Sequence, residues 1–126
     1  MRRFAKLGPG MTVSEKRMVT ESDVEAFARL TGDVNPVHFG PSAVVHGVLL
    51  NGLVSCVLGT RLPGPGYVVV QQSMTFPNAC RVGESVLVFV EVTNARKIVE
   101  CRYVCTRCAD GKIVHEGLAK LVLRRD

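Results

Sequence analysis

The chain has 126 residues, which is enough for one domain and not for two. Its apolar fraction of 47% excludes an intrinsically disordered chain. The net charge of +5 would suit nucleic acid, an acidic carrier protein or a phosphate-bearing ligand. The basic residues are scattered, however, and there is no Trp and only two Tyr to stack on bases, so we expect no nucleic-acid partner.

The cysteines and the N-terminal residues indicate the cellular compartment. Five cysteines are an odd number, and no secretory apolar segment opens the chain, so we expect a reducing compartment. Residues 1–10 contain two Arg, one Lys and no acid, as a short mitochondrial targeting segment would, so we expect the mitochondrial matrix, with the cytoplasm as the alternative. The longest apolar stretch, 43–58, contains His46 and Asn51 and is shorter than a membrane helix, so we expect a soluble protein without a membrane partner.

The N-terminal third reads as a strand followed by a short helix. Residues 13–19 are predicted to be the strand. Thr20 with Asp23 three residues later predicts a helix N-cap, and Ser22 with Glu25 offers a second capping pair. Gly32 is predicted to end the helix in the left-handed conformation. The apolar face of this helix would carry Val24, Phe27, Ala28 and Thr31.

Residues 33–41 are predicted to form a loop, because Pro36 and Pro41 prevent a helix from running through it. A second helix is expected over 46–62. Its apolar residues cover most of its circumference, which predicts burial on nearly every side. Small residues would let other backbone approach it closely, namely Gly47, Gly52, Ser55 and Gly59.

The rest of the chain is predicted to be sheet, with strands over 67–76, 85–93, 98–106 and 113–123. Asp110-Gly111 favours a tight hairpin between the last two. Consecutive short connections predict antiparallel pairing. One apolar helix among long antiparallel strands indicates an α+β fold in which a twisted sheet curls round the helix.

Asp33 and His38 are the candidates for chemistry. An acid and an imidazole lie five residues apart on a proline-constrained loop. Asp is ionised near neutral pH and His titrates near it, so together they could activate a water and deliver a proton to carbon. Asn35 can orient a partner or close the turn, and a simple turn remains the alternative interpretation of this segment.

The wider pattern resembles the MaoC-like family, close to (R)-specific enoyl-CoA hydratases and mitochondrial 3-hydroxyacyl-thioester dehydratase. Its pieces are G-D-x-N-P-x-H at 32–38, V-H-G at 45–47, L-P-G-x-G at 62–66 and V-G-E at 82–84, and the resemblance spans 5–124. It implies a single MaoC-like domain over the whole chain, a hot-dog fold and a homodimer. It also implies a hydro-lyase without cofactor or metal, which reversibly hydrates a trans-2-enoyl thioester to the (R)-3-hydroxyacyl thioester, carried on coenzyme A or acyl carrier protein, in fatty-acid metabolism.

The resemblance also implies roles for five residues. Asp33 and His38 would be the catalytic acid–base pair, with the base left open between them. Asn35 would support their geometry. Gly47 would donate its main-chain N–H to the thioester oxygen, as the positive end of a helix dipole favours. Ser55, two turns further along the helix, would form a hydrogen bond within the site.

The chain departs from this family in one place. Only residues 39–45 separate His38 from His46, where family members have a longer stretch. Two alternatives therefore stand beside the hydro-lyase. One is a hot-dog acyl-thioesterase, and the other is an acyl-thioester binding module impaired by the shortened loop 39–45.

The remaining candidates have plainer interpretations. Cys101, Cys105 and Cys108 would need Cys80 or His115 as a fourth ligand for zinc, and we interpret them as buried thiols. Cys56 is predicted to lie in the core. His46 is interpreted as helping to begin the helix in preference to acting in the site, and His115 as structural.

Overall fold

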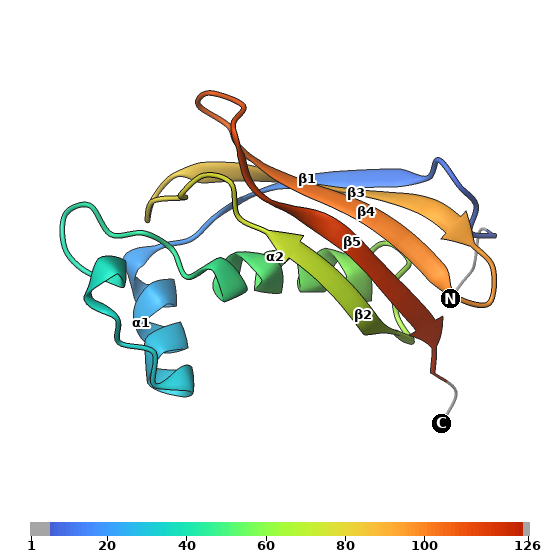
Figure 1. Ribbon diagram of the computed structural model, residues 1–126, viewed down its shortest axis with the longest axis horizontal. Coiled ribbons are helices and arrows are strands. Elements are labelled where there is room, and N and C mark those ends of the chain that lie inside the picture. Colours follow the sequence, from blue (N-terminus) through green and yellow to red (C-terminus); the bar gives the residue numbers. More distant parts are fainter. Residues whose placement is uncertain (1–5, 125–126) are drawn as a thin grey trace.

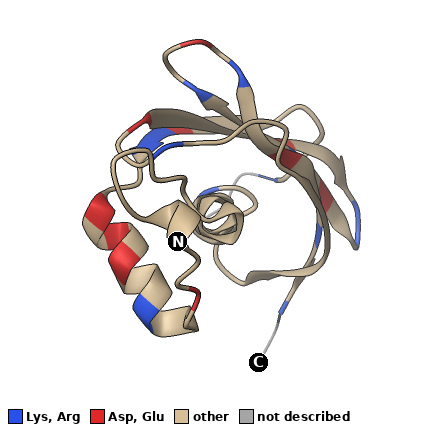
Figure 2. Ribbon diagram, turned by 60° about the vertical axis from the view of Figure 1, so that its left-hand side comes forward, with Lys and Arg blue, Asp and Glu red and all other residues tan. Residues whose placement is uncertain are grey.

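The computed structural model describes residues 6–124, which excludes the first half of the predicted targeting segment. A five-stranded antiparallel sheet with the order β1-β3-β4-β5-β2 curls round the central helix α2 (Figures 1 and 2). The predicted α+β class and the hot-dog wrap are confirmed. The elements are β1 (Thr12–Met18), α1 (Glu21–Thr31), the 3-10 turn η1 (Pro36–His38), α2 (Gly47–Thr60), β2 (Tyr67–Thr75), β3 (Ser85–Ala95), β4 (Val99–Arg107) and β5 (Ile113–Leu123).

Helix α1 begins and ends as predicted. The Asp23 N–H donates to Thr20 Oγ1 at 3.2 Å, and the Thr20 N–H donates to Asp23 Oδ2 at 2.9 Å, which completes a capping box. Gly32 has φ 82°, and its N–H donates to the Ala28 carbonyl. The second pair, Ser22 with Glu25, does not cap the helix because Ser22 already lies in its first turn.

Helix α2 is buried on one side only, so the prediction of burial on nearly every side is wrong. Leu50, Leu53, Val54, Val57 and Leu58 face the core. The sheet arches over that side and leaves the opposite side open (Figure 2). The exposed face carries Val48, Gly52, Ser55 and Cys56, so Cys56 is not a core residue as predicted.

The strand boundaries agree with the predictions to within about two residues, but the pairing partner of one strand differs from the prediction. Short turns join β3 to β4 and β4 to β5, which pair as predicted. Strand β2 pairs with β5 and not with β3. The reason is that residues 76–84 cross beneath the sheet toward the start of α2, where the Val45 N–H donates to the Cys80 carbonyl at 2.8 Å. This crossing forms one wall of the candidate site.

No helix within residues 6–124 is long and apolar enough to span a membrane.

Candidate active site

The loop after α1 is folded by its own polar side chains. Gly32 turns the chain away from the helix. The Asn35 N–H donates to Asp33 Oδ1 at 3.2 Å, and the Val37 N–H donates to Asn35 Oδ1 at 3.3 Å. Asn35 is therefore the N-cap of the 3-10 turn, and this turn sets the separation of Asp33 from His38.

The ring of His38 is fixed by the short segment that follows it. Its Nδ1 atom lies 2.6 Å from the carbonyl oxygen of Val44, which can only accept a hydrogen bond. The hydrogen-bond pattern therefore assigns the proton of the neutral ring to Nδ1 and leaves the lone pair on Nε2. The Val44 N–H in turn donates to the Val37 carbonyl at 2.9 Å. This pairing orients His38 with Nε2 free to exchange a proton.

A second histidine joins the pair. The exposed fraction of His46 is 2%, and its ring stacks on that of His38 with centroids 3.6 Å apart. Its Nε2 atom lies 3.2 Å from the main-chain oxygen of Asp33 and 3.9 Å from the Oδ2 atom of the same residue. One side-chain ligand atom from each of Asp33, His38 and His46 lies within 4.8 Å of the others. The sequence analysis preferred a role for His46 in beginning the helix, and His46 is the N-cap of α2, but its ring also lies in this cluster.

Gly47 begins α2 directly beside this cluster. The first N–H groups of a helix have no intrahelical acceptor, and the helix dipole makes this end positive. A Cβ atom at Gly47 would come within 2.9 Å of the Phe76 ring. Glycine thus lets Phe76 close over the helix start while the N–H stays available to an anionic oxygen.

A cavity of about 390 Å³ opens between this helix start, the loop and the crossing segment. Its walls are mainly apolar and suit a short hydrocarbon group beside the polar cluster. They include His38, Gly47, Leu50, Phe76, Cys80 and Val114. An imidazole with a free nitrogen and a helix-start N–H therefore line one apolar cavity, and the Asp33 carboxylate lies within 4.8 Å of the two imidazoles beside it.

A family model described as a MaoC like domain matches residues 4–109. The chain belongs to the MaoC-like family. It is 37% identical over 132 residues to an (R)-specific enoyl-CoA hydratase of Rhodospirillum rubrum, with 95% of this chain and 90% of that protein covered. It is 40% identical over 129 residues to a 3-hydroxybutyryl-CoA dehydratase of Methylorubrum extorquens, with 92% and 80% covered.

Comparison with solved structures agrees with this family assignment. The solved structure of the (R)-hydratase from A. caviae involved in PHA biosynthesis matches with a TM-score of 0.88 and 32% identity, covering 93% of this chain and 97% of that one. The alignment with the R. rubrum protein is longer than the 126 residues of this chain, so that MaoC-like relative has residues without a counterpart here. In the present structure the short segment 39–45 nevertheless holds His38, through the Val44 carbonyl.

Ser55 of this MaoC-like chain lies away from the cluster. It is exposed on α2, about 12 Å along the helix axis from Gly47 at 1.5 Å per residue. The structure brings together Asp33, Asn35, His38 and Gly47, and it does not bring Ser55 to them. The hydrogen bond expected from Ser55 stays a prediction.

Cys80 is a potential nucleophile in the cavity wall, but its surroundings keep it protonated. Burial, assisted by the negative charge of Glu84, raises the pKa of this thiol to about 11. The reactive form of cysteine is the thiolate, which is scarce near neutral pH at that pKa. Among the described residues of this site, Asp33 and His38 therefore stay the predicted candidates for proton transfer.

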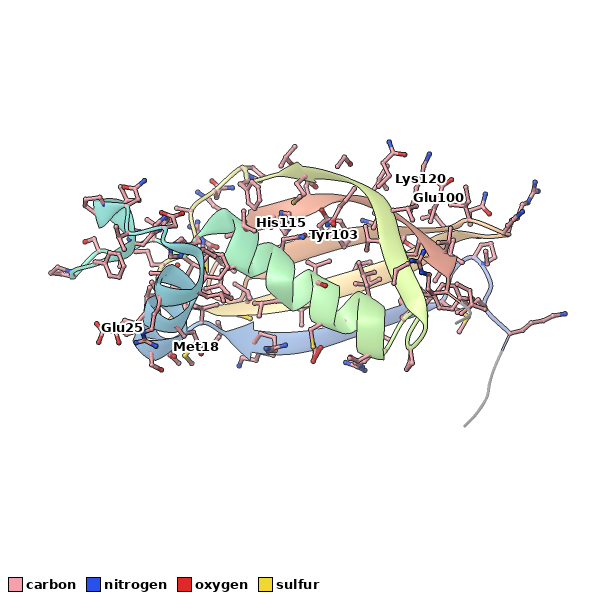
Figure 3. All side chains as sticks on the ribbon, turned by 90° about the horizontal axis from the view of Figure 1, so that it is seen from below. Met18, Glu25, Glu100, Tyr103, His115 and Lys120 are labelled. Atoms are coloured by element: carbon pink, nitrogen blue, oxygen red, sulfur yellow. The ribbon has the colours of Figure 1, made fainter. Side chains whose placement is uncertain are left out.

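Behind Phe76 lies a buried polar network that the sequence did not reveal. The Phe76 ring stacks on His115 with centroids 4.5 Å apart. His115 Nε2 is 2.9 Å from Asn51 Oδ1, and the Gln72 amide donates to Asn51 Oδ1 at 2.6 Å and to Tyr103 Oη at 2.9 Å. His115 and Tyr103 lie on the face of the sheet that α2 covers (Figure 3). The network ties α2 to three strands beside the cavity wall.

Proposed function

We propose that this MaoC-like protein is a hydro-lyase that reversibly hydrates a trans-2-enoyl thioester to the (R)-3-hydroxyacyl thioester in fatty-acid metabolism. The observation that carries the proposal is an apolar cavity lined by His38 and by the helix-start residue Gly47, with the Asp33 carboxylate within 4.8 Å of the His38 ring. The names of the R. rubrum and M. extorquens relatives support it. The acyl group would be carried on coenzyme A or acyl carrier protein.

The proposed reaction uses each group in a defined way. The oxygen of a water molecule bonds to C3 of the enoyl chain, the electron pair of the C2–C3 double bond forms a C1–C2 double bond, and the π pair of the thioester carbonyl moves onto its oxygen as an enolate. The Gly47 N–H stabilises that oxygen. The pair Asp33 and His38 takes the proton from water and delivers a proton to C2, and dehydration follows the same steps in reverse. The Nε2 lone pair of His38 and the Asp33 carboxylate are the two proton acceptors for this exchange.

We propose that the hydration needs no cofactor and no metal. Two imidazoles and a carboxylate are also a common donor set for transition metals. Protein dialysed against a chelator should therefore keep its turnover of crotonyl-CoA unchanged. Turnover lost on chelation and restored by one divalent metal would contradict this part of the proposal.

Product analysis of the wild-type protein tests the proposed reaction. Incubation with crotonyl-CoA should remove the near-ultraviolet absorbance of the enoyl thioester without releasing free thiol, and the product should be the (R)-3-hydroxybutyryl thioester. Released thiol would instead support the acyl-thioesterase. Binding without turnover on four- to eight-carbon enoyl substrates would support the acyl-thioester binding module with an impaired loop 39–45.

We propose that the protein acts as a homodimer. Strand β2 is an edge of the sheet and exposes Val68, Val69, Val70 and Met74. An apolar edge with free hydrogen-bonding groups is a template for pairing with another strand. The exposed face of α2 adjoins it, and the acyl chain would run along this face from Gly47 to Ser55.

Substitution at the β2 edge tests the dimer. Val70→Lys should give a monomer in sedimentation equilibrium, because a charge on an edge strand opposes pairing. The matched control is Leu118→Lys, which places the same charge at an exposed residue of β5, inside the sheet. A wild-type monomer, or dimers retained by Val70→Lys, would contradict pairing through β2.

For location we propose the mitochondrial matrix, with the cytoplasm as the alternative. The basic residues before position 10 support the matrix, as does 27% identity to a mitochondrial 3-hydroxyacyl-[acyl-carrier-protein] dehydratase of Arabidopsis thaliana. The bacterial relatives, at higher identity, support the alternative. Fluorescence of a C-terminal fusion in cells, with and without residues 1–10, separates the two.

A further inference from the structure

His46 contacts both members of the proposed acid–base pair and directly precedes the proposed oxyanion donor. Its ring stacks on His38, with an angle of 24° between the planes, and its Nε2 atom approaches the main chain of Asp33 at 3.2 Å. We propose that His46 is a positioning residue, which holds Asp33 and His38 in a fixed arrangement around the Gly47 N–H. This inference rests on the function proposed above.

The contact with Asp33 defines the state of the His46 ring. The carbonyl oxygen of Asp33 can only accept a hydrogen bond, so Nε2 of His46 donates to it. The carboxylate of Asp33 lies further from the same atom, with Oδ2 at 3.9 Å. His46 therefore fixes the backbone that carries the carboxylate and leaves its Oδ2 atom to meet water, while Oδ1 accepts from the Asn35 N–H.

The other ring nitrogen argues against a purely structural role for this histidine. The Nδ1 atom of His46 is buried and has no hydrogen-bond partner within residues 6–124. A buried polar atom without a partner costs free energy, which an apolar side chain at this position would avoid. Unsatisfied buried groups of this kind call for an explanation in function, and the contacts with Asp33 and His38 supply one.

The backbone of His46 links the same ring to the helix start. His46 is the N-cap of α2, and its carbonyl accepts hydrogen bonds from the N–H groups of Leu49 and Leu50 at 3.0 and 3.1 Å. Phe27 of α1 packs against the ring with centroids 4.7 Å apart. The ring is therefore held between α1 and α2. Any rotation of His46 would move the acid–base pair relative to the Gly47 N–H.

The experiment separates the two contacts of the ring by three variants, assayed with crotonyl-CoA. His46→Phe keeps a flat ring against His38 and loses the N–H. His46→Gln keeps an N–H donor and loses the ring, and His46→Leu loses both. Because a misplacement of about 1 Å can cost about 100-fold in rate, we expect kcat to fall about 100-fold in His46→Leu and about tenfold in each of the other two.

The substrate should bind these variants normally, because the proposal gives His46 no contact with it. KM should stay within about threefold of wild type, as expected when only the transition state is affected. The dissociation constant of butyryl-CoA, which is saturated and cannot be hydrated, should be unchanged. The control for lost stability is Val90→Ala, a truncation of a fully buried residue in the sheet, which should lower the melting temperature and keep kcat.

The outcomes are distinct. A large fall in kcat for His46→Leu, with partial activity in the other two variants, supports the positioning role. A kcat for His46→Leu as high as that of Val90→Ala would overturn it, and so would equal losses in all three variants. Wild-type protein without turnover would contradict the proposed hydratase function, and the role of His46 would fall with it.

Discussion

At the scale of single residues, the structure separates the cysteines into buried and accessible ones. Burial raises the pKa of Cys101 to about 11 and that of Cys105 to about 12, as it does for Cys80. Cys56 and Cys108 are exposed in the single chain. The buried thiols therefore fill the core, as their sequence pattern predicted for Cys101 and Cys105, while the predictions for Cys56 and Cys108 were wrong.

This difference predicts thiol reactivity. In native protein at pH 8, a thiol reagent should modify Cys108 quickly and leave Cys80, Cys101 and Cys105 unmodified, because the thiolate is rare at these raised pKa values and access is blocked. Cys56 lies on the α2 face beside the proposed dimer edge, so its rate should rise when Val70→Lys separates the protomers. Peptide mass spectrometry after timed labelling measures each site. Rapid labelling of the three buried thiols would contradict the packing.

A second prediction concerns His115. Burial lowers its pKa below the usual 6.5, against the opposing effect of the Thr75 carbonyl. As the pH falls below 6.5, the unfolded chain takes up a proton at this residue before the folded chain does. The free energy of unfolding therefore decreases as the pH falls from 6.5 to the lowered pKa of the folded chain. Above pH 6.5 the effect vanishes.

Urea denaturation at pH 7.5, 6.5, 5.5 and 4.5 measures this effect by comparing wild type with His115→Gln. The variant should lose less stability on acidification than wild type does. Hydrogen bonds with Thr20 and Arg107 lower the pKa values of Asp23 and Asp110 from 3.8. The stability that these two carboxylates lose at low pH should be the same in both proteins. Parallel curves for the two proteins would show that His115 does not titrate in this way.

At the scale of elements, local chemistry was predictable and long-range pairing was not. Thr20, Asp23 and Gly32 define α1 through contacts within four residues, so the sequence pattern was sufficient. The pairing of β2 with β5 depends on the crossing segment 76–84, and His46 meets Asp33 across 13 positions. The bulge at Val70, which turns Gln72 inward to Asn51, also has no clear sequence signal.

The packing of β5 against β2 gives a prediction for Gly117. The Tyr103 hydroxyl donates to the Ser73 carbonyl at 2.8 Å directly beside this glycine. A Cβ atom at Gly117 would collide with the Ser73 carbonyl and lie 2.6 Å from the Tyr103 hydroxyl. Gly117→Ala should therefore lower the free energy of unfolding by about 2 kcal/mol or more, as overpacking of a core does.

The matched control for this substitution is Gly59→Ala, because nothing lies within 4 Å of a Cβ atom there. In helix α2 this change should raise stability by up to about 1 kcal/mol. Chemical denaturation of both variants gives the comparison. Equal stabilities for Gly117→Ala and wild type would mean that β2 and β5 separate easily at this point.

At the scale of the whole molecule, the candidate site residues meet where three segments converge at one end of the curved sheet. The loop 33–38, the start of α2 and the crossing segment each contribute part of the cavity. We propose that the 126 residues form a single domain, so that heat unfolds the site and the sheet in one transition. The sequence motif predicted Asp33, His38 and Gly47 as site residues, and the structure brings them close together, whereas their roles in catalysis stay a prediction.

The central claim is that Asp33 and His38 together perform the proton transfers of hydration. The most direct measurement is kcat for crotonyl-CoA in wild type, Asp33→Asn and His38→Ala, with melting temperatures to show that each protein is folded. Loss of a general acid–base group should lower kcat by about two to four orders of magnitude in each variant. Either folded variant with kcat within tenfold of wild type would contradict the claim for that residue.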